Sequence, residues 1–276
     1  MNKTDVFEEP TKMSLLSTNY RFLLDVIEQF AAKDPSITIL DYGCGRGEIV
    51  QAARSKKIQV FGADVFHGGP SVPTYLAKEG LLGNVIREIH NEKLQFLDKT
   101  FDLVISNQVF EHVKDLDKVL KEIHRVMKPN GVLYALFPPK EIFREGHTGI
   151  PFLHRFPRNK SRYFYTLALR RLGFGTDIKN SEISSQEWTN NKCVYIDTKT
   201  FYRPAKEIKS LFNKYFTWEH REDEIIRFRA ENLNNFPGRL ILSWMRIPGV
   251  KQMGMVLFTR LAGYLIVAHP KILADS

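Results

Sequence analysis

Residues 36–47, Ser-Ile-Thr-Ile-Leu-Asp-Tyr-Gly-Cys-Gly-Arg-Gly, decide the fold of this chain. An apolar run ends on Asp41 and breaks into a turn with glycine at positions 43, 45 and 47. Because glycine permits a positive φ and carries no Cβ, a ligand can approach such a turn closely. A helix that begins near Glu48 would direct free N–H groups at the same ligand. The stretch therefore predicts a strand, a cofactor-binding loop and a helix.

A second acidic residue supports this prediction. The apolar run Ile58–Ala63 ends on Asp64, 23 positions after Asp41. An acidic residue at the end of the next parallel strand is where the ribose hydroxyls of a nucleotide cofactor are usually held. The glycines are spaced G-x-G-x-G rather than G-x-G-x-x-G, and the acid in front of them would repel a pyrophosphate but suit the ammonium of an amino-acid tail. We expect a nucleoside-containing cofactor that is not a dinucleotide.

This loop resembles the first motif, D/E-x-G-x-G-x-G, of the class I S-adenosylmethionine-dependent methyltransferases, in particular their small-molecule, type 11-like branch. The resemblance continues through residues 101–113 and 120–133, which look like the family's fourth strand, the helix after it and its fifth strand. It covers residues 36–137 in order and in spacing. It implies S-adenosyl-L-methionine as the cofactor and methyl transfer as the activity.

The resemblance also implies cofactor contacts, residue by residue. Asp41 would hold the methionine ammonium through water, and the backbone of Gly43 and Gly45 would meet the methionine tail. Asp64 would accept hydrogen bonds from the ribose hydroxyls. Asn107, just past the fourth strand, sits where a backbone carbonyl of the family often meets the ammonium.

The chain departs from the family's pattern after the third strand. The family commonly has an Asp-Ala-Glu-like turn there that meets the adenine, whereas residues 89–94 read Ile-His-Asn-Glu-Lys-Leu. We expect Asn91, or His90 beside it, to take the place of that acid.

Hydrophobic periodicity predicts a Rossmann-like α/β fold. A helix over residues 13–32 leads into strands at about 36–41, 58–62, 85–89, 101–106 and 131–137, which alternate with helices at about 47–55, 73–79 and 115–127. Such alternation implies a mostly parallel sheet with helices on both faces. The last of these helices is expected to end at Lys128-Pro-Asn-Gly, with Asn-Gly supplying a left-handed turn into the next strand.

The pattern changes after Phe137. We expect a helix over 203–215, a strand over 215–220, helical structure from about 224 to 261 and a closing strand over 263–268. The resemblance implies seven strands, with the last one antiparallel, and a substrate lid inserted after the fifth strand. The chain is thus expected to be a single domain over 1–276, with a cofactor-binding core at 13–137, the lid at 138–202, and C-terminal helices and closing strands at 203–276.

Histidine is the candidate catalytic residue type. A hydroxyl acceptor must lose a proton when it is methylated, and neutral imidazole suits that task at the pH of the cell. His147 and His154 lie in the expected lid, and His112 follows the fourth strand. Two lid histidines without a well-placed pair of carboxylates give no expectation of a metal site.

The net positive charge of the chain lies in its second half. Residues 1–140 hold 18 basic and 18 acidic residues, whereas residues 141–276 hold 22 and 13. Between Glu145 and Asp177 there are six basic residues and no acid: Arg155, Arg158, Lys160, Arg162, Arg170 and Arg171. Such a cluster either attracts an anionic acceptor, a nucleic acid or an anionic lipid surface, or forms a solvated helix face.

The favoured acceptor is a small anionic molecule, such as a saccharide or a lipid-linked glycan precursor. Residues 150–157 resemble methyltransferases of surface-polysaccharide pathways. Enzymes that methylate nucleobase amino groups often have an Asn/Asp-Pro-Pro-aromatic turn, whereas residues 106–110 read Ser-Asn-Gln-Val-Phe, which disfavours an RNA methyltransferase. Two further alternatives stay open: a noncatalytic cofactor-binding or scaffold protein, and a peripheral membrane protein whose residues 238–248 and 253–261 alternate apolar runs with arginine.

Composition favours a cytoplasmic protein, with contact to the inner face of the membrane left open. Two cysteines, Cys44 and Cys193, are too few and too far apart for a disulfide framework or a zinc site. The first ten residues are acidic and lack the apolar core of a signal peptide. No uninterrupted apolar run reaches the roughly 18 residues of a membrane span.

Overall fold

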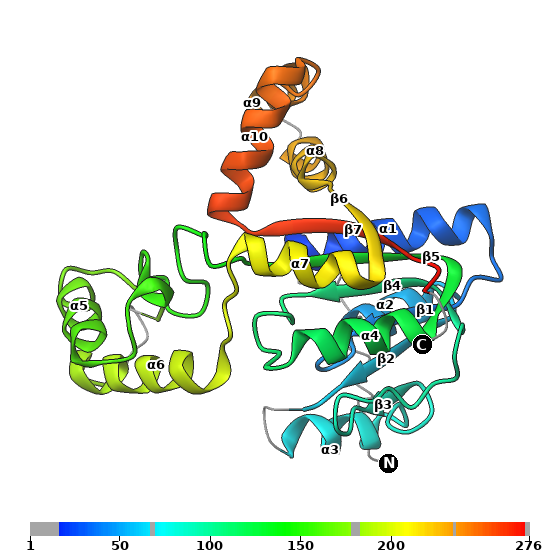
Figure 1. The fold of residues 1–276 in the computed structure, drawn as a ribbon, viewed down its shortest axis with the longest axis horizontal. Helices are drawn as coiled ribbons and strands as arrows, with labels where there is room; N and C mark the ends of the chain where they lie inside the picture. The colour runs from blue at the N-terminus through cyan, green and yellow to red at the C-terminus, as the bar shows by residue number, and fades with distance from the viewer. Residues whose placement is uncertain (1–16, 67–69, 178–182, 234–235, 274–276) are drawn as a thin grey trace, which may run out of the picture.

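The computed structural model describes residues 17–66, 70–177, 183–233 and 236–273. They form an α/β fold around one seven-stranded sheet with the strand order β3-β2-β1-β4-β5-β7-β6 (Figure 1). The strands are β1 (Ile39–Tyr42), β2 (Val60–Asp64), β3 (Ile86–Glu88), β4 (Phe101–Asn107), β5 (Met127–Phe137), β6 (Phe216–His220) and β7 (Tyr264–Pro270). The Rossmann-like sheet that the sequence predicts is confirmed.

The direction of the strands also agrees with the prediction. β1 to β5 pair in parallel, whereas β7 is antiparallel to both of its neighbours, β5 and β6. In the central register, Asp41 of β1 lies beside Gly62 of β2 and Ile105 of β4. Because parallel strands end at the same edge of a sheet, the segments that follow β1, β2, β3 and β4 meet at that edge.

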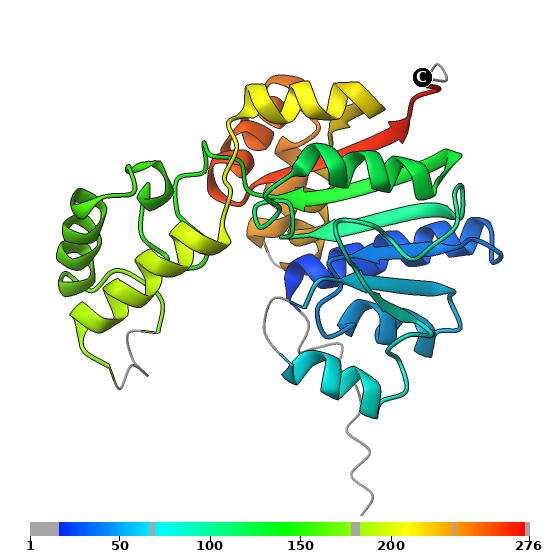
Figure 2. The same cartoon turned by 60° about the horizontal axis from the view of Figure 1, so that its bottom comes forward.

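Helices cover both faces of the sheet (Figure 2). One buried cluster joins the sheet to α1 (Thr18–Lys33), α2 (Glu48–Ser55), α3 (Ser71–Lys78) and α8 (Glu222–Leu233), and a second joins its other face to α4 (Leu116–Val126) and α7 (Ala205–Tyr215). Ile39 and Leu40 belong to opposite clusters, because successive side chains of a strand point to opposite faces. The helix predicted from residue 13 is present from Thr18, and residues 13–16 lie outside the described ranges.

The turn predicted at Lys128-Pro-Asn-Gly is wrong. α4 ends at Val126, but β5 begins directly at Met127, and neither Asn130 nor Gly131 is left-handed. Residues before a proline favour extended backbone, so Pro129 keeps this stretch in the strand. In place of a turn, the pairing of β5 with β4 shifts in register between Phe101 and Leu103. Gly131 is needed for space, since a Cβ there would lie 3.0 Å from the carbonyl oxygen of Phe101.

The long C-terminal helical run is interrupted. It forms α8, which packs on the sheet, and then α9 (Phe236–Trp244) and α10 (Pro248–Leu261), which stand away from it (Figure 1). Pro248 opens α10, where a missing N–H costs nothing because the first turn of a helix has no intrahelical acceptor for it. No helix among the described residues is both long and apolar enough to cross a membrane.

The segment between β5 and α7 projects from one end of the sheet (Figures 1 and 2). It contains the 3-10 helix η2 (Leu153–Arg155), α5 (Lys160–Arg171) and α6 (Ser185–Lys199). Its own small core consists of Ile150, Leu153, Trp188 and Ile196. We call residues 138–202 the inserted segment.

The glycine loop after β1 has the left-handed backbone that its sequence predicts. The φ angles are 80° at Gly43, 53° at Gly45 and 72° at Gly47. A Cβ at residue 43 would lie 2.2 Å from Cγ2 of Val109, whereas a Cβ at residue 45 would meet nothing within 4 Å. Gly43 is therefore needed for packing, and Gly45 borders open space that a ligand can enter.

We predict that Gly43→Ala destabilises the fold more than Gly45→Ala does. In both variants a residue with a Cβ must adopt left-handed backbone, which costs about 1–2 kcal/mol of folding free energy. Only the residue 43 variant also overlaps Val109, which adds about 1–3 kcal/mol of overpacking. Urea unfolding followed by circular dichroism measures both free energies, and equal values for the two variants would contradict the packing role of Gly43.

Candidate functional site

The carboxylate of Asp64 lies against the glycine loop. Its Oδ2 accepts a hydrogen bond from the backbone N–H of Gly45 at 2.8 Å, and its Oδ1 accepts one from Phe66 at 2.7 Å. An ionised carboxylate has about four acceptor positions, so two remain for further donors such as hydroxyl groups. The structure thus brings the ends of β1 and β2 together around one acid.

Asp41 is a buried acid at the same edge, with 3% of its surface exposed. Burial, followed by the charge of Asp64, raises its pKa to about 8. Tyr20 of α1 shares this environment, and burial, followed by the charge of Asp41, raises the pKa of its hydroxyl to about 12. No salt bridge to Asp41 forms within the described residues. A cationic ligand group would restore the ionised state of such an acid.

Two more predicted residues lie at this edge. Asn107 closes β4, and its Oδ1 accepts a hydrogen bond from Nδ2 of Asn19 at 3.4 Å. Arg229 of α8 donates to Oδ1 of Asn19 at 2.9 Å, which links α1 and α8 to the end of β4. Asn91 follows β3 and is exposed, with a left-handed φ of 53°. Asn19 and Arg229 were not predicted, because they come from distant parts of the chain.

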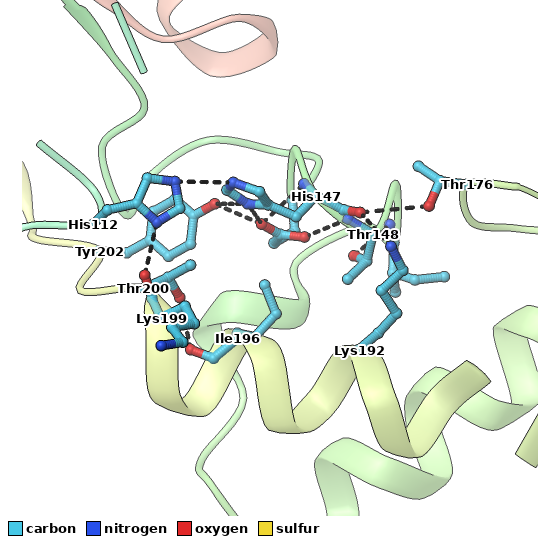
Figure 3. Close-up of polar contacts among 11 residues, drawn as sticks. His112, His147, Thr148, Thr176, Lys192, Ile196, Lys199, Thr200 and Tyr202 are labelled. Atoms are coloured by element: carbon cyan, nitrogen blue, oxygen red, sulfur yellow. Dashed lines mark hydrogen bonds and ion pairs between the residues drawn. The ribbon is translucent and has the colours of Figure 1, made fainter. Parts of the chain in front are cut away.

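A polar cluster in the inserted segment surrounds Glu145, which is fully buried. Figure 3 labels its partners His147, Thr148 and Tyr202. Its Oε1 accepts a hydrogen bond from the Tyr202 hydroxyl at 2.6 Å and lies 2.7 Å from Nδ1 of His147. Its Oε2 accepts from the backbone N–H of Thr148 at 2.7 Å. Burial opposes ionisation, but the hydrogen bonds from His147 and Tyr202 outweigh it and lower the pKa of Glu145 to about 2. Glu145 is therefore a carboxylate, and Nδ1 of His147 is the donor.

His112 faces His147 across this cluster (Figure 3). The two Nε2 atoms are 3.1 Å apart, and the rings meet edge to face with centroids 4.9 Å apart. Nδ1 of His112 lies 2.7 Å from the carbonyl oxygen of Lys199, and since a carbonyl only accepts, this nitrogen carries a proton. The structure thus brings together two of the three predicted histidines.

Glu111 lies directly before His112 and is 2% exposed. Neither of its carboxyl oxygens has a hydrogen-bond partner among the described residues. Burial raises the pKa of this carboxyl to about 8. Glu111, His112 and His147 each offer one ligand atom, and these atoms lie within 4.8 Å of one another.

The third predicted histidine, His154, is held separately. Its Nε2 donates to the carbonyl oxygen of Lys140 at 2.9 Å, and its ring packs on Tyr202 with centroids 4.7 Å apart. The side chain is 6% exposed, and burial lowers its pKa. His154 is therefore a neutral packing residue, and the structure does not place it in the His112–His147 pair.

Two cavities meet at Tyr202. The first has a volume of about 440 Å³ and is lined by Gln108, Glu145, His147 and Tyr202, together with Leu261 and Ala262 at the end of α10. Gln108 directly follows Asn107, so this cavity adjoins the edge that carries Asp41 and Asp64. We call it the acceptor cavity.

The second cavity, of about 420 Å³, is basic. Its lining includes Lys140, Arg155, Arg158 and Arg203. Arg162 of the predicted charge cluster also lines it, but Arg162 and Arg170 are buried and bonded within the inserted segment. Arg162 pairs with Asp197, and Arg170 donates to the carbonyl oxygen of Thr176 at 2.7 Å and stacks on Trp188. The guanidinium groups of these two residues therefore bind within the inserted segment.

Sequence reasoning missed three residues of the polar cluster: Glu111, Glu145 and Tyr202. The pairs Glu111-His112 and Glu145-x-His147 place an acid within two positions of each candidate histidine, and this is the signal that could have found two of them. Tyr202 has no such signal, because its contact with Glu145 spans 57 positions.

Comparison with known proteins agrees with this geometry. A family model described as a methyltransferase domain matches residues 40–135. The ubiquinone/menaquinone biosynthesis C-methyltransferase UbiE of Hydrogenovibrio crunogenus is 37% identical over 107 residues, which cover 37% of this chain and 42% of that protein. The mitochondrial arginine-hydroxylase NDUFAF5 of Rattus norvegicus is 35% identical over 96 residues, which cover 34% of this chain and 26% of that protein.

A third relative is the ubiquinone biosynthesis O-methyltransferase of Mesorhizobium japonicum, which is 28% identical over 121 residues, covering 41% of this chain and 49% of that protein. This chain thus spans less than half the length of these curated relatives. The matched region contains the glycine loop, Asp64 and β4, and ends within β5. Residues 40–135 of this chain therefore form a methyltransferase domain.

Proposed function

We propose that this protein transfers a methyl group from S-adenosylmethionine to a small acceptor bound in the acceptor cavity. The observation that carries the proposal is the position of that cavity. Its lining joins Gln108, next to the cofactor edge, to the Glu145–His147–Tyr202 cluster. An acceptor held there lies between the cofactor edge and a group that can take its proton.

For the cofactor, we propose the contacts that the family resemblance implies. Asp41 faces the ammonium, and the backbone at Gly43 and Gly45 lies against the methionine tail. Asp64 keeps acceptor positions for the ribose hydroxyls. Asn107 lies at the ammonium, and Asn91 lies at the adenine. The open space at Gly45 and the raised pKa of the Asp41 carboxyl support a ligand with a cationic tail.

The cofactor supplies an activated methyl group, so the chain's task is to position the acceptor and to receive a proton. Correct positioning accounts for up to roughly 7–11 kcal/mol of such a barrier. Glu145 fixes the ring of His147 through Nδ1, which leaves Nε2 with a lone pair toward His112. We therefore propose that His147, held by Glu145 and with His112 beside it, takes the proton from the acceptor.

We propose an acceptor that carries negative charge, such as a saccharide or a lipid-linked glycan precursor. The basic cavity beside Tyr202 supports this, because Arg155 and Arg158 are exposed around it. Two of the relatives are named for ubiquinone biosynthesis, which supports an acceptor with a lipid part. One relative is named as a hydroxylase, so transfer of a labelled methyl group is the deciding measurement.

The C-terminal helices support contact with a membrane surface. α10 has no buried residue and exposes Met253, Val256, Leu257 and Leu261, with Lys251 and Arg260 on the same helix. Apolar side chains next to basic ones are typical of helices that lie in the interface of anionic bilayers. Because Leu261 also lines the acceptor cavity, a lipid-linked acceptor could pass from the bilayer into the site.

We predict that His147→Asn lowers the rate of methyl transfer about 10²- to 10⁴-fold, the usual contribution of a general base. The measurement uses S-adenosylmethionine with a labelled methyl group in a metabolite and lipid extract, followed by identification of the labelled product. The control His269→Asn changes an exposed residue of β7 and should leave the rate unchanged. An extract in which the wild type labels nothing would reject methyl transfer, and equal rates for the two variants would reject the role of His147.

We predict that cofactor binding releases a proton below pH 8. The Asp41 carboxyl, with a pKa of about 8, is mostly protonated there, and an ammonium beside it favours the ionised form. The affinity for the cofactor should therefore rise with pH, by up to about tenfold per pH unit between about pH 6 and 7.5. Calorimetry in buffers of different ionisation enthalpy counts the protons. Asp41→Asn should abolish the release; a pH-independent wild-type affinity would contradict the assignment.

We predict that the protein binds anionic vesicles through α10. In a flotation assay, the wild type should float with vesicles that contain phosphatidylserine, and less so at high salt because exposed charges are screened. Val256→Asp with Leu257→Asp should abolish flotation. Phe164→Asp alters an equally exposed apolar residue on α5 and should not. Flotation that is the same in all three proteins would exclude α10 as the contact surface.

A further inference from the structure

We propose that Glu111, His112 and His147 bind a divalent transition-metal ion. Two of these ligands come from the loop after β4 and the third from the inserted segment, so the ion would join that segment to the cofactor-binding core. Binding of the ion can be tested without methyl transfer, but a bound ion would take over the removal of the acceptor proton that is proposed above for His147.

The hydrogen bonds of the two histidines fix their tautomers. Nδ1 of His112 donates to the Lys199 carbonyl, and Nδ1 of His147 donates to the Glu145 carboxylate. In neutral rings both Nε2 atoms then carry lone pairs, and these two atoms are 3.1 Å apart (Figure 3). Facing lone pairs at this distance repel each other unless a cation lies between them. Two nitrogens that each bind one zinc ion at about 2.0–2.1 Å are about 3 Å apart, so the spacing suits shared coordination.

Glu111 supplies the third ligand and the independent evidence. Its side chain is 2% exposed, and neither carboxyl oxygen has a partner among the described residues. A buried carboxyl without hydrogen bonds costs folding free energy, and a bound cation would remove that cost. The three ligand atoms lie within 4.8 Å of one another, so rotation of the side chains can bring them to one ion.

The residues around the ligands match those of established metal centres. A histidine ligand usually donates its second N–H to a carboxylate or a backbone carbonyl, which fixes its tautomer. Glu145 does this for His147, and Lys199 does it for His112. Glu145 is held in turn by Tyr202 and by the backbone of Thr148.

The ligand set selects the kind of metal. Two imidazoles and one carboxylate suit Zn²⁺ or Fe²⁺, whereas Mg²⁺ and Ca²⁺ prefer oxygen ligands. Three protein ligands leave at least one coordination position for water or for an acceptor oxygen, and His147 lines the acceptor cavity. With the ion bound, the two Nε2 atoms are ligands and no longer take a proton. The ion would then promote loss of the acceptor proton by lowering the pKa of an oxygen bound to it.

Metal binding can be measured on the whole protein without cofactor or acceptor. After treatment with a chelator, samples are dialysed against Zn²⁺, anaerobic Fe²⁺ or Mg²⁺, and the retained metal is quantified by mass spectrometry. We expect about one Zn²⁺ or Fe²⁺ per chain and no Mg²⁺. His112→Ala, His147→Ala and Glu111→Gln should each weaken Zn²⁺ binding more than about a hundredfold, since loss of an outer-shell partner alone costs about 10- to 100-fold. His269→Ala, which removes an exposed histidine, should bind as the wild type does.

A second measurement keeps the proposal open to rejection if a ligand variant does not fold. Glu145→Gln should lower Zn²⁺ affinity about 10- to 100-fold and should change the visible absorption of Co²⁺ bound in its place. Wild-type protein that retains no Zn²⁺ or Fe²⁺ overturns the proposal and leaves a shared proton between the histidines. Equal Zn²⁺ affinity in the wild type, Glu111→Gln and His147→Ala overturns it as well. Cofactor calorimetry on the same samples reports separately on the proposed function.

Discussion

The parallel pairing of β1 with β2 and β4 is the constraint on which the rest of this structure depends. This register places Asp41 beside Gly62 and Ile105, so the carboxyl ends of three neighbouring strands reach the same edge. Asp64 then accepts a hydrogen bond from the glycine loop, and Asn107 closes β4 at that edge, directly before Gln108. Without this alignment, the acids and glycines of the first motif would be separate features of the chain.

The inserted segment is attached to this edge by buried polar contacts rather than by a large apolar interface. Within the segment, the backbone N–H of Phe201 donates to the carbonyl oxygen of Glu111. Directly after the segment, Arg203 donates to the carbonyl oxygens of Phe110 and Val113. Together with the contact between His112 and His147, these bonds position one side of the acceptor cavity. The geometry of that cavity therefore follows from hydrogen bonds between residues that are far apart in the sequence.

The basic cluster shows why charge counts along a chain are ambiguous. Residues 155–171 contain six bases, but Arg162 and Arg170 each satisfy buried acceptors or stack on an aromatic ring. Their charges hold the inserted segment together, whereas Arg155 and Arg158 are exposed beside the basic cavity. A run of basic residues does not reveal which of its members point inward, because that depends on acceptors supplied by other segments, such as Asp197.

The sequence by itself determined the core of the fold and the cofactor edge. Glycine spacing, the acids at strand ends and the alternation of strand and helix are local patterns, and they predicted the seven strands around β1 and β4. They failed where backbone crowding decides the outcome, as at Gly131, where lack of space for a Cβ and not a left-handed turn requires glycine. Only the tertiary structure decided which histidines meet. Glu111, His112, Glu145, His147 and Tyr202 are brought together across up to 91 positions of sequence. Burial raises the pKa of Glu111, whereas hydrogen bonds from His147 and Tyr202 outweigh burial and lower that of Glu145, and no local pattern encodes this difference.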